Sequence, residues 1–176
     1  MWQSIVSFFS NLFGGGSHPQ PVAVPQGTEP QSVPPWIAIA QKELGVAEVP
    51  GLHNNARIIE YLAATKLRAS TDTVPWCSAF VNWCMAQAGY KNTGSAMARS
   101  WLEYGDRLID PVYGCITILK RGDSAWQGHA TFYLEQGSQL DTIKCLGGNQ
   151  NQSVCIKEYS KANVLGYVWP KKSDKL

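Results

Sequence analysis

The order of two hydrophobic patterns is the feature of this chain that most constrains its fold. Between about residues 35 and 88, apolar residues recur at the three- and four-residue spacing of amphipathic helices. From residue 115 onward, short runs of β-branched and aromatic residues alternate with Gly, Asn and Ser, which is typical of strands joined by turns. Helices followed by strands predict an α+β domain in which the N-terminal helices pack on a mostly antiparallel sheet.

Turn and cap residues set the expected bounds of these elements. Pro is common at the start of a helix and Gly just after its end, so Pro35, Gly45 and Gly89 limit the helices. The expected helices cover about residues 36–44, 55–66, 77–88 and 100–104. The expected strands cover residues 115–120, 129–135, 142–146, 153–159 and 164–169.

The 176 residues are enough for one domain with additional segments. Residues 1–13 carry apolar side chains on one helical face and are expected to form an amphipathic helix. Residues 14–35 contain three consecutive glycines and six prolines, which predicts a flexible linker. The compact domain is then expected over residues 36–170, followed by a charged tail at 171–176.

The amphipathic segment 2–13 is too short to span a bilayer, which takes about 20 apolar residues. It also lacks the charged start of a signal peptide, because the first Lys or Arg of the chain is Lys42. Three roles therefore stay open for it: contact with another protein, contact with a membrane surface, or coverage of an apolar patch on its own domain.

Charge and cysteine content exclude several classes of function. The formal net charge is +2 and Lys and Arg are scattered, so we expect no nucleic-acid partner. The five cysteines include no CxxC pair, which argues against a zinc module and against a disulfide scaffold, and we expect no metal or other cofactor. Cys145 and Cys155 flank a predicted hairpin, where they form either a disulfide or, as we expect, two reduced thiols.

Cys77 is expected at the first position of the third helix. The unpaired N–H groups and the positive end of the helix dipole stabilise a thiolate at that position. Phe80, Val81 and Cys84 follow at +3, +4 and +7 and share its face, so the sulfur is expected to point toward the sheet. A partner for the thiol must therefore come from a strand.

Of the three histidines, His129 is the one placed to meet that sulfur, because it begins a predicted strand while the others lie in the linker and in a loop. A Cys–His pair needs a third polar group that fixes the imidazole tautomer. Asn149 is the preferred candidate, since the two glycines before it allow backbone to pass close to the site. The alternatives are Gln150, Asn151 and Glu135.

Several blocks of sequence carry a family resemblance. They are D-T-V-P-W-C-S-A-F-V-N-W-C from Asp72, R-G-D-S-A-W-Q-G-H-A-T-F-Y from Arg121, L-G-G-N-Q-N-Q-S-V from Leu146 and V-L-G-Y-V-W-P from Val164. In this order they resemble the CHAP and NlpC/P60 superfamily of cysteine hydrolases, and within it the small phage and prophage enzymes that degrade peptidoglycan. The resemblance covers roughly residues 36 to 170.

The resemblance implies a papain-like fold and hydrolysis of an amide bond in peptidoglycan, either between muramic acid and L-alanine or within the stem peptide. It carries the nucleophile over to Cys77, the base to His129 and the third polar role to Asn149. The residues expected to contact substrate are Trp76, Trp126 and Gln150.

The resemblance also implies where the protein acts. Its partner would be bacterial peptidoglycan, reached from the periplasm or the cell exterior by a phage-encoded or virion-associated protein with a monomeric catalytic domain. Since no signal peptide is expected, delivery depends on other factors. Residues 2–13 would then contact a virion protein or a membrane surface.

Two other classes of function compete with the hydrolase. Related sequences often have Gly-Asp where this chain has Gly114 and Cys115, which motivates a non-catalytic virion or wall-binding domain that keeps the fold. The other is a zinc module built from Cys77, Cys84, Cys115 and His129, which lacks the usual ligand spacing.

Overall fold

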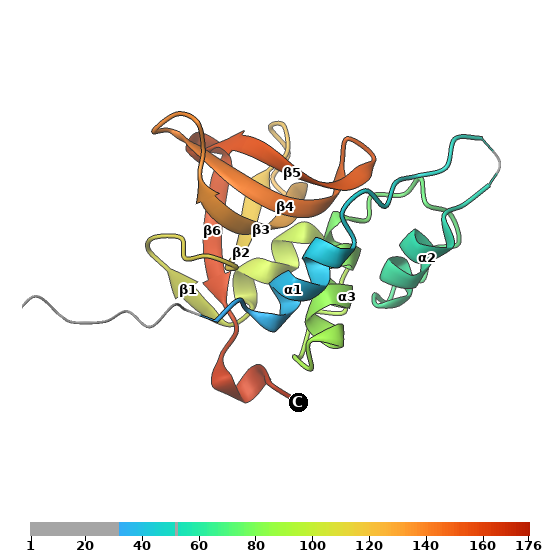
Figure 1. Ribbon diagram of the computed structural model, residues 1–176, viewed down its shortest axis with the longest axis horizontal. Coiled ribbons are helices and arrows are strands. Elements are labelled where there is room, and N and C mark those ends of the chain that lie inside the picture. The colour runs from blue at the N-terminus through green and yellow to red at the C-terminus, as the bar shows by residue number, and fades with distance from the viewer. Residues whose placement is uncertain (1–31, 52) are drawn as a thin grey trace, which may run out of the picture. The chain divides into compact units, whose positions relative to one another are not determined.

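The structure is a computed structural model that describes residues 32–51 and 53–176 (Figure 1). Its helices are α1 (Pro35–Lys42), α2 (Ala56–Ala63), α3 (Cys77–Gln87) and the 3-10 helices η1 (Ala98–Glu103), η2 (Lys161–Asn163) and η3 (Lys172–Asp174). Its strands are β1 (Asp106–Leu108), β2 (Ile116–Lys120), β3 (Gly128–Gln136), β4 (Thr142–Gln150), β5 (Ser153–Ser160) and β6 (Val164–Trp169). The predicted helix at 1–13 and the linker up to residue 31 lie outside the described residues.

The strands form one sheet in the order β1-β6-β2-β3-β4-β5, and every neighbouring pair in it is antiparallel. The three α-helices precede the sheet in the chain and lie beside it (Figure 1). The α+β class predicted from the sequence is therefore confirmed. Most of the expected bounds agree with the structure to within three residues. The sequence does not predict β1 or the short helices η2 and η3, and β4 continues through the glycines to Gln150.

The core lies between the helices and one face of the sheet. Helix α3 packs on β3 and β4, and α1 and α2 both pack on α3. Along β2, Ile116 and Ile118 join this main core, whereas Cys115 and Leu119 belong to a second, smaller cluster. That alternation is the two-residue period of a strand that is buried on both faces.

The chain enters and leaves the domain by specific contacts. At the entrance, the indole N–H of Trp36 on α1 donates to the carbonyl of Gly114 at 2.8 Å. At the exit, the predicted charged tail packs against the end of α3, where the Leu176 N–H donates to Gly89 O at 2.7 Å and the Lys91 N–H to Asp174 O at 2.6 Å. The ends of the described domain are thus attached to its body.

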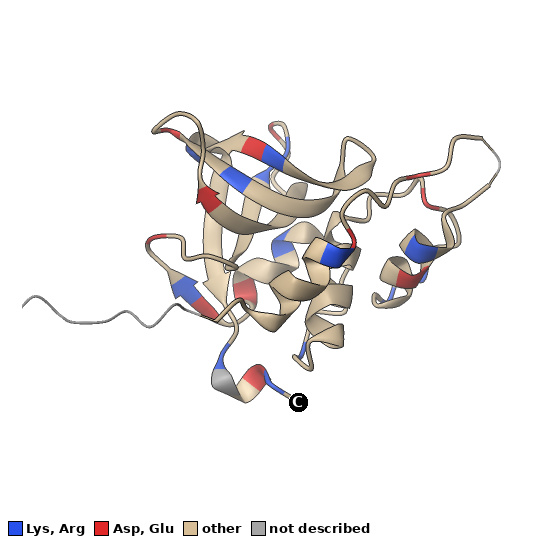
Figure 2. Ribbon diagram, viewed as in Figure 1, with Lys and Arg blue, Asp and Glu red and all other residues tan. Residues whose placement is uncertain are grey.

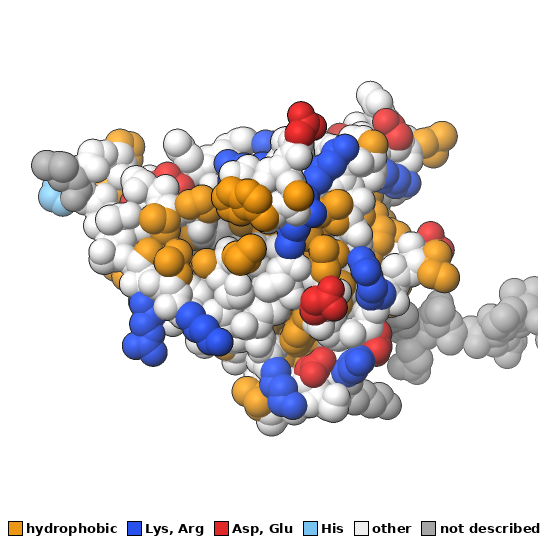
Figure 3. Space-filling model, turned by 180° about the vertical axis from the view of Figure 1, so that it is seen from behind, with side chains coloured by type: hydrophobic (Ala, Val, Ile, Leu, Met, Phe, Trp, Pro, Cys, Tyr) orange, Lys and Arg blue, Asp and Glu red, His pale blue; other side chains and the backbone are white. Residues whose placement is uncertain are grey.

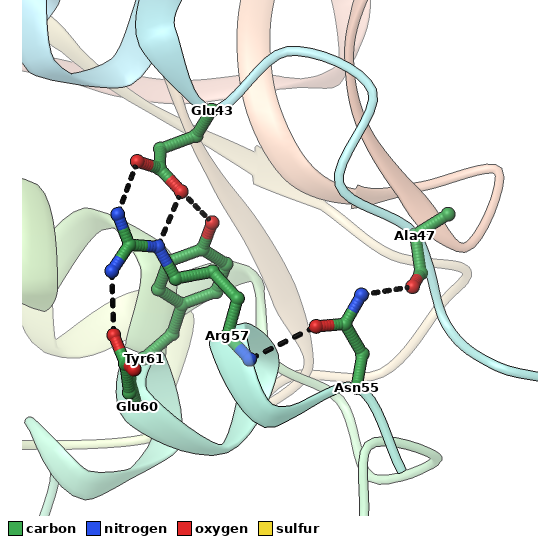
Figure 4. A network of polar contacts seen from close by, with 6 residues as sticks. All are labelled: Glu43, Ala47, Asn55, Arg57, Glu60 and Tyr61. Atoms are coloured by element: carbon green, nitrogen blue, oxygen red, sulfur yellow. Dashed lines mark hydrogen bonds and ion pairs between the residues drawn. The ribbon is translucent and has the colours of Figure 1, made fainter. Parts of the chain in front are cut away.

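A charge network around the buried Glu43 carboxylate joins the end of α1 to α2 (Figure 4). The guanidinium of Arg57 binds both carboxylate oxygens of Glu43 at 2.8 and 2.9 Å, and the Tyr61 hydroxyl donates to the same carboxylate. Arg57 also pairs with Glu60 at 2.6 Å on the exposed side. Asn55 caps α2 by accepting from the Arg57 N–H and donates to Ala47 O, which fixes the loop before the helix.

The surface shows where hydrophobic side chains remain exposed. On the reverse face of the molecule they gather across the middle, with Lys and Arg side chains around them (Figure 3). None of the helices among the described residues has the length and apolar character needed to cross a bilayer.

The carboxylate of Glu43 should make the Arg57 network pH-dependent. Burial by itself raises the pKa of Glu43, but the hydrogen bonds from Arg57 and Tyr61 outweigh it and the pKa is lowered. The stabilisation is therefore present above the ordinary glutamate pKa of about 4.3 and is lost as the pH falls through the lowered value.

We expect Arg57→Met to lower the free energy of unfolding at pH 7 by about 2 kcal/mol, because it leaves the buried Glu43 carboxylate short of donors. Glu60→Gln removes only the exposed ion pair with Arg57 and should lower the free energy of unfolding by about 0.5 kcal/mol or less. Urea unfolding at pH 7 and pH 3.5 measures both, and the loss caused by Arg57→Met should shrink at the lower pH. Equal losses for the two variants, or a loss independent of pH, would show that the Glu43 carboxylate does not depend on Arg57.

Candidate active site

The candidate nucleophile lies where the sequence predicted it. Cys77 is the first residue of α3, and its side chain is 4% exposed. The start of the helix is held by polar contacts: Ser78 Oγ donates to Ser95 O at 2.7 Å, and the Trp101 indole donates to Ser78 Oγ at 3.0 Å. Asn82 Nδ2 donates to the Ser78 and Ser95 carbonyls. These bonds fix the loop before η1 against the helix end that carries the thiol.

The surroundings of Cys77 favour its thiolate. Burial by itself raises the pKa of this thiol, but the charge and hydrogen bond of the His129 imidazole and the backbone N–H groups of Ala130 and Ser78 outweigh it. The net pKa of Cys77 is therefore lowered. A cysteine thiolate is a strong nucleophile, whereas the thiol is not.

Burial has the opposite net effect on the other buried cysteines. It raises the pKa of Cys84 and the pKa of Cys145, and it raises the pKa of Cys115 to about 11. All five cysteines are free, and Cys145 is paired with Lys157 while Cys155 is paired with Gly147, so the two are offset along the hairpin. The structure therefore has two free thiols, and no disulfide, at Cys145 and Cys155.

The second member of the site is His129, near the start of β3. Its Nε2 lies 3.1 Å from Gln150 Oε1 and 3.3 Å from the Tyr159 hydroxyl. Because Nε2 faces these two groups, Nδ1 is the nitrogen that remains for Cys77. The pair predicted from the sequence is thus brought together by the first turn of α3 and the start of β3.

Gln150 fixes the tautomer of this imidazole. Its Nε2 donates to the carbonyls of Cys155 and, at 3.4 Å, Cys145, so its amide oxygen must face the histidine. The Tyr159 hydroxyl donates to that same oxygen at 3.0 Å. With an amide oxygen and a hydroxyl oxygen before it, His129 Nε2 carries a proton and Nδ1 is left unprotonated in the neutral ring.

Asn149, the preferred third residue from the sequence, makes a different contact. In the amide orientation that satisfies its neighbours, its Oδ1 accepts from the Trp76 backbone N–H at 3.1 Å and from the Trp76 indole N–H at 3.2 Å. Among the described residues no hydrogen bond joins it to His129, and Gln150, one of the alternatives weighed from the sequence, occupies that position. The physical reason is a β-bulge between Gly147 and Gln150, where Asn149 has a φ of 57°.

The two glycines before Asn149 allow this arrangement, as expected. A Cβ at Gly148 would lie 2.4 Å from the Trp76 ring and 2.7 Å from Phe80 Cβ. At Gly147 it would lie 2.5 Å from Thr131 Oγ1 and 2.9 Å from Gln150 Oε1. Without side chains at both positions, β4 approaches the start of α3 and Gln150 folds back to the histidine.

Two grooves have Cys77 in their walls. An apolar one of about 350 Å³ is lined mainly by Leu67, Pro75, Met97 and Trp126. A polar one of about 460 Å³ is lined by His129, Asn149, Tyr159 and several basic and amide side chains. Cys77 and Arg121 border both grooves. A substrate lying across the thiol would therefore meet two walls of different chemistry.

The three residues expected to contact substrate are placed differently. Trp126 is 66% exposed on the wall of the apolar groove, in a loop that Arg99 holds through the carbonyls of Gln127 and Ser124. Trp76 is fully buried, and its indole donates to Glu48 at 2.9 Å, so the prediction that it contacts substrate is corrected to a packing role. Gln150 borders the polar groove but is 1% exposed and bonded at both ends of its amide, which corrects its role to orienting His129.

The cysteines of the zinc alternative do not gather around the site. Within residues 32–51 and 53–176, no group of three or more His, Cys, Asp and Glu side chains is close enough to hold a metal. Cys115 is buried in the second cluster near Thr117.

In comparisons with known proteins, the chain matches no protein-family model and no curated protein sequence.

The orientation of His129 can be tested directly by ¹⁵N NMR of its ring. In Cys77→Ala at alkaline pH the ring is neutral, and we expect the Nε2–H tautomer because the Gln150 oxygen faces Nε2. Adding Gln150→Leu should remove this preference, whereas adding Asn149→Ser should leave it in place. Loss of the tautomer in the Asn149 variant alone would return the orienting role to Asn149.

Proposed function

We propose that the chain is a papain-like cysteine hydrolase of the CHAP and NlpC/P60 superfamily that cleaves amide bonds in bacterial peptidoglycan. The observation that carries this proposal is the lowered pKa of a thiol at a helix N-terminus beside an imidazole of fixed tautomer. Nucleophile, base and orienting group are the three parts that thiol hydrolysis requires. The order of the sequence blocks, from the Cys77 helix to the His129 and Gln150 strands, supports the family assignment.

In the proposed mechanism, Cys77 Sγ attacks the scissile carbonyl carbon and forms a C–S bond. The backbone N–H of Cys77 has no partner within its helix and stabilises the oxyanion, a contribution of about 3 kcal/mol per donor in comparable sites. The C–N bond then breaks as His129 gives its Nδ1 proton to the leaving amine. His129 next takes a proton from water, whose oxygen attacks the thioester to release the acid and restore Cys77.

Gln150 suits this mechanism better than a carboxylate would. A neutral amide accepts from His129 Nε2 without adding a negative charge beside the thiolate. Its contact with Nε2 keeps Nδ1 of His129 directed at the reacting atoms throughout the cycle.

The proposed substrate places the activity at the bacterial cell wall. A phage-encoded or virion-associated protein acting from the periplasm or the cell exterior fits this role, with a monomeric catalytic domain. Muropeptides released from purified wall and identified by mass spectrometry would show whether the muramoyl–alanine bond or a stem-peptide bond is cut.

Cleavage of purified peptidoglycan by wild type and by Cys77→Ala tests the proposed function. We expect Cys77→Ala to lose at least about 10³-fold in the rate of muropeptide release, because it removes the nucleophile. Cys84→Ala, a second thiol of the same helix, is the matched control and should keep the activity. Each variant is first checked for a cooperative thermal transition.

The competing function predicts another result in the same assay. A non-catalytic wall-binding domain would sediment with the wall and release no muropeptides, with equal binding by wild type and Cys77→Ala. That outcome would remove Cys77 from any reaction and would replace the hydrolase proposal.

A further inference from the structure

The polar groove beside Cys77 has a one-sided charge. Among the described residues, its wall includes Lys120, Arg121 and Lys157 and no acidic residue. Over the fold as a whole, basic and acidic residues are interspersed (Figure 2). Asp123 lies with Arg121 in the connection between β2 and β3, but it lines neither groove. The groove is thus a local concentration of positive charge next to the thiol.

These three cations are available for a ligand. The ion pairs among the described residues join other side chains, so none of the three is neutralised in that way. Lys157 Nζ bonds to Asn151 Oδ1 at 3.1 Å and lies 5.6 Å from the Tyr159 ring centre, contacts that position the ammonium without cancelling its charge. A guanidinium and an ammonium on one wall suit a carboxylate.

The position of His129 tells which part of a substrate enters this groove. The imidazole must protonate the leaving nitrogen, so that nitrogen lies beside His129 during the reaction. His129 lines the polar groove and does not line the apolar one. The leaving amine therefore extends along the basic wall, while the acyl part lies toward Trp126 and Met97 on the other side of Cys77.

We propose that the polar groove selects substrates whose leaving-amine segment carries a free carboxylate, bound by Arg121 and Lys157. This inference rests on the proposed hydrolase function and narrows it to a substrate class. The muramoyl–L-alanine bond and the L-alanyl–D-glutamate bond of the stem peptide satisfy it when the α-carboxylate of D-glutamate is free, since that group lies on the amine side of both. In the bond from the γ-carboxyl of D-glutamate to the next residue, the same group lies on the acyl side, so the inference disfavours that bond. Amidation of the same carboxylate removes the charge without changing the scissile bond.

The test uses two substrates that differ in that one charge. They are N-acetylmuramoyl-L-alanyl-D-glutamate fragments whose γ-carboxyl is blocked as an N-methylamide and whose α-carboxylate is either free or converted to a carboxamide. We expect wild type to prefer the free carboxylate by about five- to tenfold in kcat/KM at low salt, as for a charge-assisted contact that is partly exposed. Arg121→Gln and Lys157→Gln should each reduce this ratio, and Lys42→Gln, an exposed cation outside both grooves, should not.

The preference should also weaken at 0.5 M salt, because exposed charges are screened over a few ångströms at that ionic strength. A ratio near one in wild type, or a ratio that Arg121→Gln and Lys157→Gln both leave unchanged, overturns the inference.

A binding measurement separates failure of this inference from failure of the proposed function. Calorimetric titration of Cys77→Ala with the two fragments reports on the groove without catalysis. Tighter binding of the carboxylate form, lost in the added Arg121→Gln, supports the groove assignment even if wild type cleaves neither fragment. Equal binding of the two fragments overturns it even if wild type is an active hydrolase.

Discussion

The interaction between Cys77 and His129, which helps to lower the pKa of the Cys77 thiol, is the one on which the candidate site depends. A thiol buried at 4% exposure would ordinarily stay neutral, as the raised pKa values of Cys84 and Cys145 illustrate. At Cys77 the same burial strengthens the interaction of the sulfur with His129 and with the N–H groups of Ser78 and Ala130, because a buried environment screens them less than water does. Burial therefore opposes an isolated charge but reinforces a pair.

The fold supplies this pair by bringing a strand unusually close to a helix end. Gly148 leaves no side chain between β4 and the start of α3, and Gly147 leaves room for Thr131 and Gln150. The bulge that follows turns Gln150 toward His129. Asn149 then accepts hydrogen bonds from Trp76, the residue just before Cys77. One irregular segment, residues 147–150, thus sets both the tautomer of His129 and the position of the helix that carries the Cys77 thiol.

The sequence could predict the parts of the site that depend on local patterns. Cys77 at a helix start and His129 at a strand start follow from hydrophobic periodicity and from Gly and Pro positions, and both lie where expected. Exchange of roles between Asn149 and Gln150 could not be predicted, because a one-residue bulge reverses which side chain faces the histidine. Strand β1 could not be predicted either, because it is only three residues long and forms by pairing with the distant β6. Burial of Trp76 depends on Gly148 of a distant strand.

The most direct test of the Cys77–His129 pair is the pH dependence of alkylation at Cys77, with iodoacetamide as reagent and peptide mass spectrometry to locate the label. The expected midpoint for Cys77 lies below the ordinary cysteine pKa of about 8.5, and His129→Ala should move it upward. A midpoint at or above that value in the folded wild-type protein, unchanged in His129→Ala, would show that no thiolate is stabilised there.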